Sequence, residues 1–186
     1  MISVFKTRMR EGRIWQGELP RKIQARDMLK ANAICDMSCR LPETILAAEI
    51  RVDTGPSHIY GLLGGHFSPD NAGQFCLAIA VEESEADVFS DSIAPRFDRG
   101  YWGLPEKYAT AISKGIMRQE QPLPCGTLKI TCAACSEIGS NRSIFAGLGN
   151  ALILAIVRQL TAAQIADLIF QQRTADMAAL LREENS

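Results

Sequence analysis

The sequence predicts an α+β fold, because strand patterns and helix patterns occupy separate stretches of the chain. Residues 44–82 carry three segments typical of short strands, and residues 105–160 carry two helical patterns on either side of a fourth strand. A chain of 186 residues fits one main domain with small additions. With 47% hydrophobic and 22% charged residues, the composition is that of an ordinary globular protein.

The first 40 residues are the basic end of the chain, with nine Lys or Arg against four Asp or Glu. Pro20 suits a first helical turn, and apolar residues then recur roughly at helical spacing. The sequence therefore predicts a helix near residues 20–34 within a basic arm, residues 1–40. Residues 82–98 hold six acids and one arginine, so a polyanion would be attracted to the arm and repelled by this segment.

Three strands are predicted before the first long helix. Residues 44–52 partly alternate between apolar and polar side chains and end at the turn formers of residues 53–56. Residues 58–67 form the next strand, although Gly64 and Gly65 weaken it or mark a bulge. A polar loop precedes the third strand, residues 75–82.

A helix over residues 105–119 and a strand over residues 128–135 follow. Pro105 suits the first helical position, and the inward stripe is spaced at three or four residues, with Tyr108, Ala111, Ile112 and Ile116. The strand alternates, which predicts one buried side formed by Leu128, Ile130, Cys132 and Ala134.

Two more helices complete the predicted chain. Ser140 or Asn141 can cap the first, which is apolar nearly all round, and its Gly147 and Gly149 indicate a closely packed neighbour. Thr161 and Gln164 form a capping box for the second, which runs toward Arg182. We expect residues 161–186 to pack on the core as a C-terminal helix.

The six cysteines are expected to be free thiols, because a chain of this length without a secretion signal needs no disulfide to hold its core. Cys132 and Cys135 have the spacing of a zinc pair, and Cys35 with Cys39 offers two more ligands. On a strand, however, the first and fourth residues point to opposite faces. We therefore expect core thiols and no metal. The longest apolar stretch is far shorter than the ~20 residues that span a bilayer, so no membrane contact and a cytoplasmic location are expected.

Five short motifs follow one another between residues 41 and 160. They are Glu43-Thr44-Ile45; a first tip (residues 55–61) ending in Tyr60-Gly61; a helix with Pro105, Tyr108, Ala111, Gly115 and Ile116; a second tip (residues 136–142); and Phe145 in the next helix. In this order they resemble the fourth domain of bacterial elongation factor G. No single motif is specific, and the first tip departs from the family, which usually has more glycine and an arginine there.

The resemblance implies a two-layer fold like the second domain of ribosomal protein S5. That fold is a four-stranded sheet with two helices on one face and a left-handed βαβ crossover, here with extra N- and C-terminal helices. It divides the chain into a basic extension (1–40), a core like the elongation factor's fourth domain (41–160) and a C-terminal helix (161–186). The two tips would lie side by side.

The resemblance also implies that the two tips bind RNA, the ribosome or a partner protein. The residues expected to make this contact are Gly55, Ser57, His58, Tyr60, Glu137, Ser140, Asn141 and Arg142. For His58 two roles stay open, a contact to RNA or a partner, and a structural cap. Arg142 either binds a phosphate at the start of the helix or only contacts Glu137 and solvent. The first tip offers backbone amides next to glycine, the His58 imidazole and the Tyr60 phenol. These groups can hydrogen-bond to a phosphate or stack on an unpaired base.

Catalysis is the alternative that the sequence favours less. No Gly-x-Ser-x-Gly or His-Glu-x-x-His motif occurs, and no Gly-x-x-x-x-Gly-Lys-Ser/Thr loop is present to hold GTP. We therefore expect no catalytic residues and no cofactor. Two readings stay open beside RNA binding: a small-molecule enzyme whose cleft joins Glu137, His58 and a cysteine, and a homodimer formed by the apolar final helices.

Overall fold

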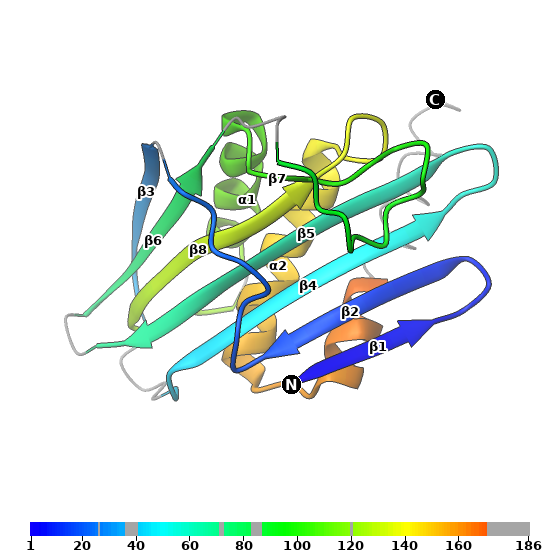
Figure 1. Cartoon of the computed structure of the whole chain (residues 1–186). Coiled ribbons are helices and arrows are strands. Elements are labelled where there is room, and N and C mark those ends of the chain that lie inside the picture. Colours follow the sequence, from blue (N-terminus) through cyan, green and yellow to red (C-terminus); the bar gives the residue numbers. More distant parts are fainter. Residues whose placement is uncertain (26, 36–40, 71–72, 83–86, 120, 171–186) are drawn as a thin grey trace, which may run out of the picture.

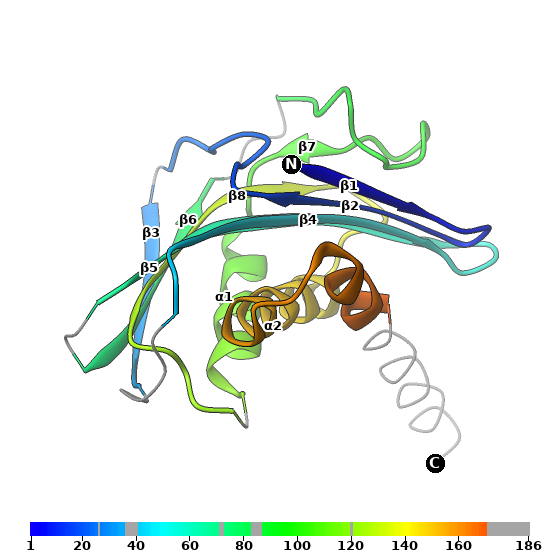
Figure 2. The ribbon, with the colours of Figure 1, turned by 90° about the horizontal axis from the view of Figure 1, so that it is seen from below.

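The computed structural model describes residues 1–25, 27–35, 41–70, 73–82, 87–119 and 121–170 as one mixed sheet with helices against one of its faces (Figures 1 and 2). The strand order is β1-β2-β4-β5-β8-β6-β3, with β7 paired to β8. The strands are β1 (Ile2–Lys6), β2 (Arg10–Gln16), β3 (Asp27–Ile34), β4 (Thr44–Asp53), β5 (His58–Pro69), β6 (Gln74–Val81), β7 (Tyr101–Trp102) and β8 (Gly126–Cys135).

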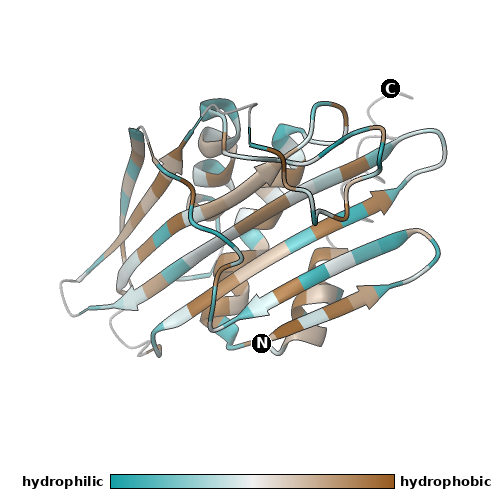
Figure 3. Ribbon diagram, in the orientation of Figure 1, coloured by the Kyte–Doolittle hydropathy of each residue, from teal (hydrophilic) through white to brown (hydrophobic). Residues whose placement is uncertain are grey.

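The sheet is antiparallel except between β6 and β8, which run parallel. Parallel neighbours need a crossover connection, and the chain supplies it through helix α1 (Glu106–Met117) between the two strands. Figure 3 shows that the central strands β5 and β8 are much more hydrophobic than β2. The four strands predicted for residues 44–52, 58–67, 75–82 and 128–135 are thus confirmed as β4, β5, β6 and β8.

The predicted four-stranded sheet with two helices is nevertheless wrong. The sheet has eight strands, and a third helical segment over residues 162–170 accompanies α1 and α2 (Arg142–Arg158). The additional strands come mainly from residues 1–34, which enter the sheet instead of forming a separate arm. A sheet of β4, β5, β8 and β6 alone would expose unpaired backbone groups along its two edge strands, β4 and β6. Strand β2 pairs with β4 and strand β3 pairs with β6, so these groups form hydrogen bonds.

The helix predicted near residues 20–34 is also wrong, because residues 27–34 form the edge strand β3. Met28, Ala31 and Ala33 pack against the core while β3 pairs along the whole of β6. The helical spacing of this segment was irregular, so the gain from sheet pairing and burial outweighs a weak local preference.

The remaining helices begin where the sequence predicts. Pro105 is the N-cap of α1, and the Asn141 side chain accepts a 3.0 Å hydrogen bond from the Ile144 amide at the start of α2. Thr161 and Gln164 exchange the hydrogen bonds of a capping box. The expected end of that last helix at Arg182 lies outside the described residues.

Helices α1 and α2 cross at very short range because glycines lie at the contact. A Cβ built on Gly115 would stand 2.5 Å from the Ala146 carbonyl oxygen, and one on Gly149 would stand 2.9 Å from Ile112. The close packing expected at Gly149 is therefore confirmed. At Gly147 it is wrong, since no other helix or strand lies within 4 Å of a Cβ there.

A β-bulge changes which face the β8 side chains occupy. The register against β5 shifts between Gly64 and Gly65 and leaves Thr131 without a paired residue in β5. As a result Leu128 and Ile130 lie in the core under the helices, whereas Cys132 and Ala134 face the opposite side. The prediction that all four share one side is wrong for this reason.

The face of the sheet away from the helices carries a smaller apolar cluster. Residues 87–104 cross this face as a long loop, and Phe89 and Trp102 from this segment pack together with ring centroids 4.2 Å apart. They cover Trp15, Leu62 and Cys132 of the sheet. This loop thus covers the side of the sheet that the helices leave open.

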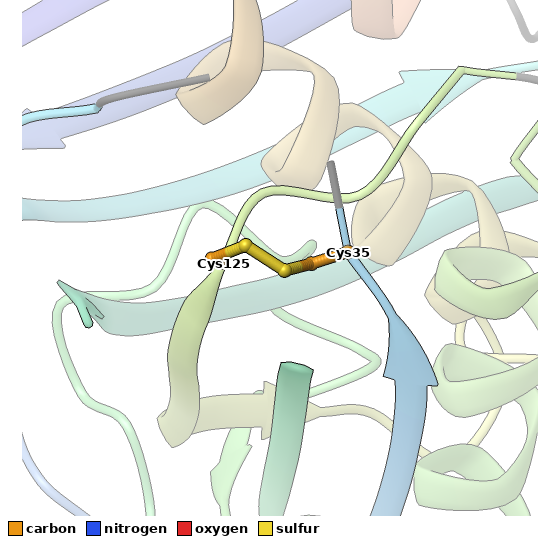
Figure 4. The surroundings of a disulfide bond; sticks show 2 residues. All are labelled: Cys35 and Cys125. Atoms are coloured by element: carbon orange, nitrogen blue, oxygen red, sulfur yellow. A yellow bond between two sulfur atoms is a disulfide. The ribbon is translucent and has the colours of Figure 1, made fainter. Parts of the chain in front are cut away.

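Two cysteines are not free thiols, contrary to expectation. Cys35, just after β3, forms a disulfide with Cys125, just before β8, with a Cα–Cα distance of 5.0 Å (Figure 4). The disulfide thereby holds the end of edge strand β3 next to the start of β8. Among the described cysteines, Cys76, Cys132 and Cys135 take part in no disulfide. Within the described residues, no helix combines the length and apolar character that crossing a bilayer requires.

Candidate functional site

The first and second tips lie side by side, joined by two hydrogen bonds. The Tyr60 amide donates to the Gly139 carbonyl at 2.9 Å, and the Ser140 hydroxyl donates to the Tyr60 carbonyl at 2.9 Å. Figure 1 shows both at the end of the sheet where β4 ends and β5 begins. The expected convergence of the two tips is therefore confirmed.

A third loop, residues 95–99, locks the two tips together through Asp98. Its carboxylate lies 2.7 Å from Nε2 of His58 in the first tip and accepts hydrogen bonds from the Ile138 and Gly139 amides of the second, at 3.0 and 2.8 Å. Gly139 has no space for a side chain, since a Cβ there would stand 2.7 Å from the His58 ring. We call the end of the molecule formed by the two tips and the third loop the tip end.

Asp98 is ionised in this position although it is buried. Burial raises the pKa of its carboxyl, but nearby donors more than compensate and hold the pKa below the ordinary value of 3.8. The Ile138 and Gly139 amides and His58 lie within hydrogen-bond distance of the carboxylate. The buried Ser136 hydroxyl forms no hydrogen bond of ordinary geometry but also lowers the pKa. Fixed donors around one carboxylate make the tip end rigid.

The eight expected contact residues divide into two groups. Gly55, Ser57, Glu137, Asn141 and Arg142 are exposed, and they form the outer surface of the two tips. His58, Tyr60 and Ser140 are buried and make internal hydrogen bonds. Their side chains hold the tips together rather than point to solvent.

A basic groove begins at Arg142 and runs between α1 and α2. It encloses about 490 Å³, and its charged lining residues are Lys107, Lys114 and Arg118 of α1 with Arg142 of α2. All four are exposed, and none of the lining residues within the described chain is acidic. No hydrogen bond or ion pair joins the Lys114, Arg118 or Arg142 side chain to another described residue.

An acidic cavity of about 580 Å³ lies on the other side of the second tip. Glu82, Glu106 and Glu137 line it together with Tyr101 and Cys135, and Lys107, which also lines the basic groove, adds a cation. His58 is not among its lining residues and is instead bound to Asp98. The structure thus brings Glu137 and a cysteine into one cavity but leaves out the histidine that the enzyme alternative requires.

Glu49 is a buried carboxyl under the 87–104 loop. It accepts hydrogen bonds from the Tyr60 hydroxyl at 2.9 Å and the Ile93 amide at 3.0 Å, and the Arg13 guanidinium lies 3.6 Å away. Burial raises the pKa of Glu49 to about 7, although these partners oppose the shift. This carboxyl ties the covering loop to the sheet and has no exposed surface.

No group of three or more His, Cys, Asp or Glu side chains within the described residues is placed to hold a metal ion. Cys132 and Cys135 belong to opposite sides of β8, and burial raises the pKa of the Cys132 thiol to about 12. Cys39, the fourth ligand considered for zinc, lies outside the described residues.

Sequence reasoning missed two parts of this site. The stripe formed by Lys107, Lys114 and Arg118 was visible, because residues seven and eleven positions apart share one helix face. Asp98 gave no signal, because its partners are about 40 residues away on either side in sequence. Comparisons of the chain with family models, curated proteins and solved structures found no match.

Proposed function

We propose that this chain is a non-catalytic RNA-binding protein that contacts its RNA with the tip end and the adjoining basic groove. The observation that carries the proposal is the position of Arg142, which belongs to the second tip and also lines the groove. A single strand of RNA lying across the tips would continue along the row of cations. The resemblance to the elongation factor makes ribosomal RNA in the cytoplasm the first ligand to test.

The charges of the groove support this proposal. The whole chain has a net charge of −1, yet four exposed cations gather in the groove without an acidic neighbour among its described lining residues. Binding to a phosphate backbone releases counterions, so such a cluster provides affinity that falls with salt. The unpaired amides and dipole at the start of α2 add a weaker attraction for a phosphate beside Arg142.

The acidic cavity defines the path of the RNA. Its three carboxylates would repel phosphates, and Glu137 stands on the cavity side of the second tip. The strand is therefore expected to leave the tip end along α1 and α2 rather than over the cavity.

The test is titration of a fluorescent RNA hairpin with a ten-nucleotide loop, followed by anisotropy. Arg142→Glu should weaken binding at least tenfold at low salt and reduce the dependence of the binding constant on salt. Lys30→Glu is the matched control, since Lys30 is an exposed cation on β3, away from the tip end. Equal affinities for the two variants would overturn the proposal, as would no binding by the unaltered protein.

The acidic cavity favours a second candidate function, binding of a small cationic molecule. Three carboxylates beside the Tyr101 ring outweigh the positive charge of Lys107 in the same lining and suit an ammonium group. A thermal-shift screen of small primary amines tests this. Stabilisation of the unaltered protein but not of Glu137→Gln would support it, and no stabilisation by any amine would remove it.

A further inference from the structure

The third loop presents an aromatic ring to solvent between two arginines. The side chains of Arg96, Phe97 and Arg99 are exposed, and Phe97 retains 76% of its accessible surface, although Asp98 between them is buried. No hydrogen bond or ion pair joins the Arg96 or Arg99 side chain to another residue in the described part of the chain. Because most of the Phe97 ring is exposed, it adds little to the core, and it stands between two exposed cations.

The ring is nevertheless held in place. Asp98 is bound by two amides of the second tip and by His58, and its own amide donates to the Pro95 carbonyl at 2.9 Å. The His58 ring meets the Phe97 ring edge-on, with centroids 5.3 Å apart and planes at 85°. A ring fixed in this way loses little entropy when a flat ligand stacks on it.

We propose that Phe97 stacks on an unpaired base of the bound RNA while Arg96 and Arg99 contact the flanking phosphates. Sites that bind single strands combine an aromatic platform with a track of cations, and the tip end has both, since the basic groove starts at Arg142 of the adjacent tip. Bases inside a duplex are stacked on each other and cannot reach such a ring. The site should therefore select single-stranded RNA.

This inference rests on the proposed function, and its test separates the two. Phe97→Ala and the unaltered protein are titrated with a single-stranded 12-mer and with the 12-base-pair duplex of the same sequence. Loss of one stacked base should weaken binding of the single strand roughly 10- to 100-fold. Affinity for the duplex should change less than twofold. Ile34→Ala is the control, because Ile34 is a 91% exposed apolar residue on β3.

A second variant reports the stacking directly. In Phe97→Trp, the single strand should quench the new exposed tryptophan, whereas the duplex should not; the native Trp15 and Trp102 are buried. Equal binding of the single strand by Phe97→Ala and the unaltered protein would overturn the stacking role while leaving the RNA-binding function standing. Equal weakening for both RNAs would also overturn it. Failure of the unaltered protein to bind either RNA would overturn the function itself.

Discussion

Nε2 of His58 lies 2.7 Å from Oδ2 of Asp98, and this buried contact joins a strand of the sheet to a loop 40 residues further along the chain. The same carboxylate oxygen accepts the Gly139 amide. One side chain therefore fixes the relative positions of all three loops of the tip end. The shape of the proposed RNA-binding surface depends on it.

Replacing Asp98 with asparagine should loosen the tip end. The substitution removes the charge that two amides and His58 stabilise, and an amide group cannot accept from all of them. We expect the free energy of unfolding to fall by roughly 2 to 4 kcal/mol, measured by urea denaturation. Asp91→Asn is the control, since that side chain is 89% exposed and its ion pair with Arg13 at the surface is worth at most about 1 kcal/mol. Equal stability of the two variants would show that Asp98 does not hold the loops.

The free energy of unfolding should fall as the pH rises, because Glu49 is buried and must lose its proton. Its folded pKa, about 7, lies above the model-peptide value of 4.5, so its stabilising contribution is complete below pH 4.5 and is lost as the pH rises through 7. The loss amounts to roughly 3 kcal/mol. Glu49→Gln should be less sensitive to pH over this range and more stable than the unaltered protein at pH 8. Parallel pH profiles of the two proteins would contradict the assignment.

Two glycine substitutions should act in opposite directions. Gly115→Ala would place a Cβ 2.5 Å from the Ala146 carbonyl oxygen and push α1 and α2 apart, at a cost of roughly 1 to 3 kcal/mol. Gly147 lies in the interior of α2, and a Cβ there would meet no other helix or strand within 4 Å, so Gly147→Ala should stabilise the protein by up to about 1 kcal/mol. Thermal unfolding of both variants checks this. A stabilising Gly115→Ala would contradict the close helix crossing.

The Cys35–Cys125 disulfide should stabilise the folded chain. It closes a loop with a sequence separation of 90, for which chain entropy predicts roughly 4 kcal/mol. The free energy of unfolding of the unaltered protein should fall on adding dithiothreitol, whereas the Cys35→Ala, Cys125→Ala double variant should show no such dependence. Cys76→Ala should retain it, because Cys76 is a free thiol. Insensitivity of the unaltered protein to dithiothreitol would show that the bond is absent.

Local patterns were predictable from the sequence. Alternation identified β4 and β8, flanking turn residues identified β5 and β6, and short-range side-chain chemistry identified the Asn141 cap and the Thr161 capping box. These features depend on residues a few positions apart. The convergence of the tips was also predicted, through the resemblance rather than through any local pattern.

Features that depend on distant partners were not predictable. Residues 27–34 became a strand because the edge of β6 needed a partner, and the bulge at Thr131 arises from pairing with β5. Asp98 and Phe97 belong to a segment without regular structure, so no periodic pattern pointed to them. The burial of His58 follows from Asp98 and was hidden for the same reason.

The most direct test of RNA binding by the tip end is an NMR titration of the ¹⁵N-labelled protein with a single-stranded RNA 12-mer. RNA binding by the tip end predicts that the amides whose shifts change gather in residues 96–99, 137–143 and 107–118. Amides of β1 and β3 should stay unchanged. Shifts confined to those edge strands, or no shifts at saturating RNA, would contradict it.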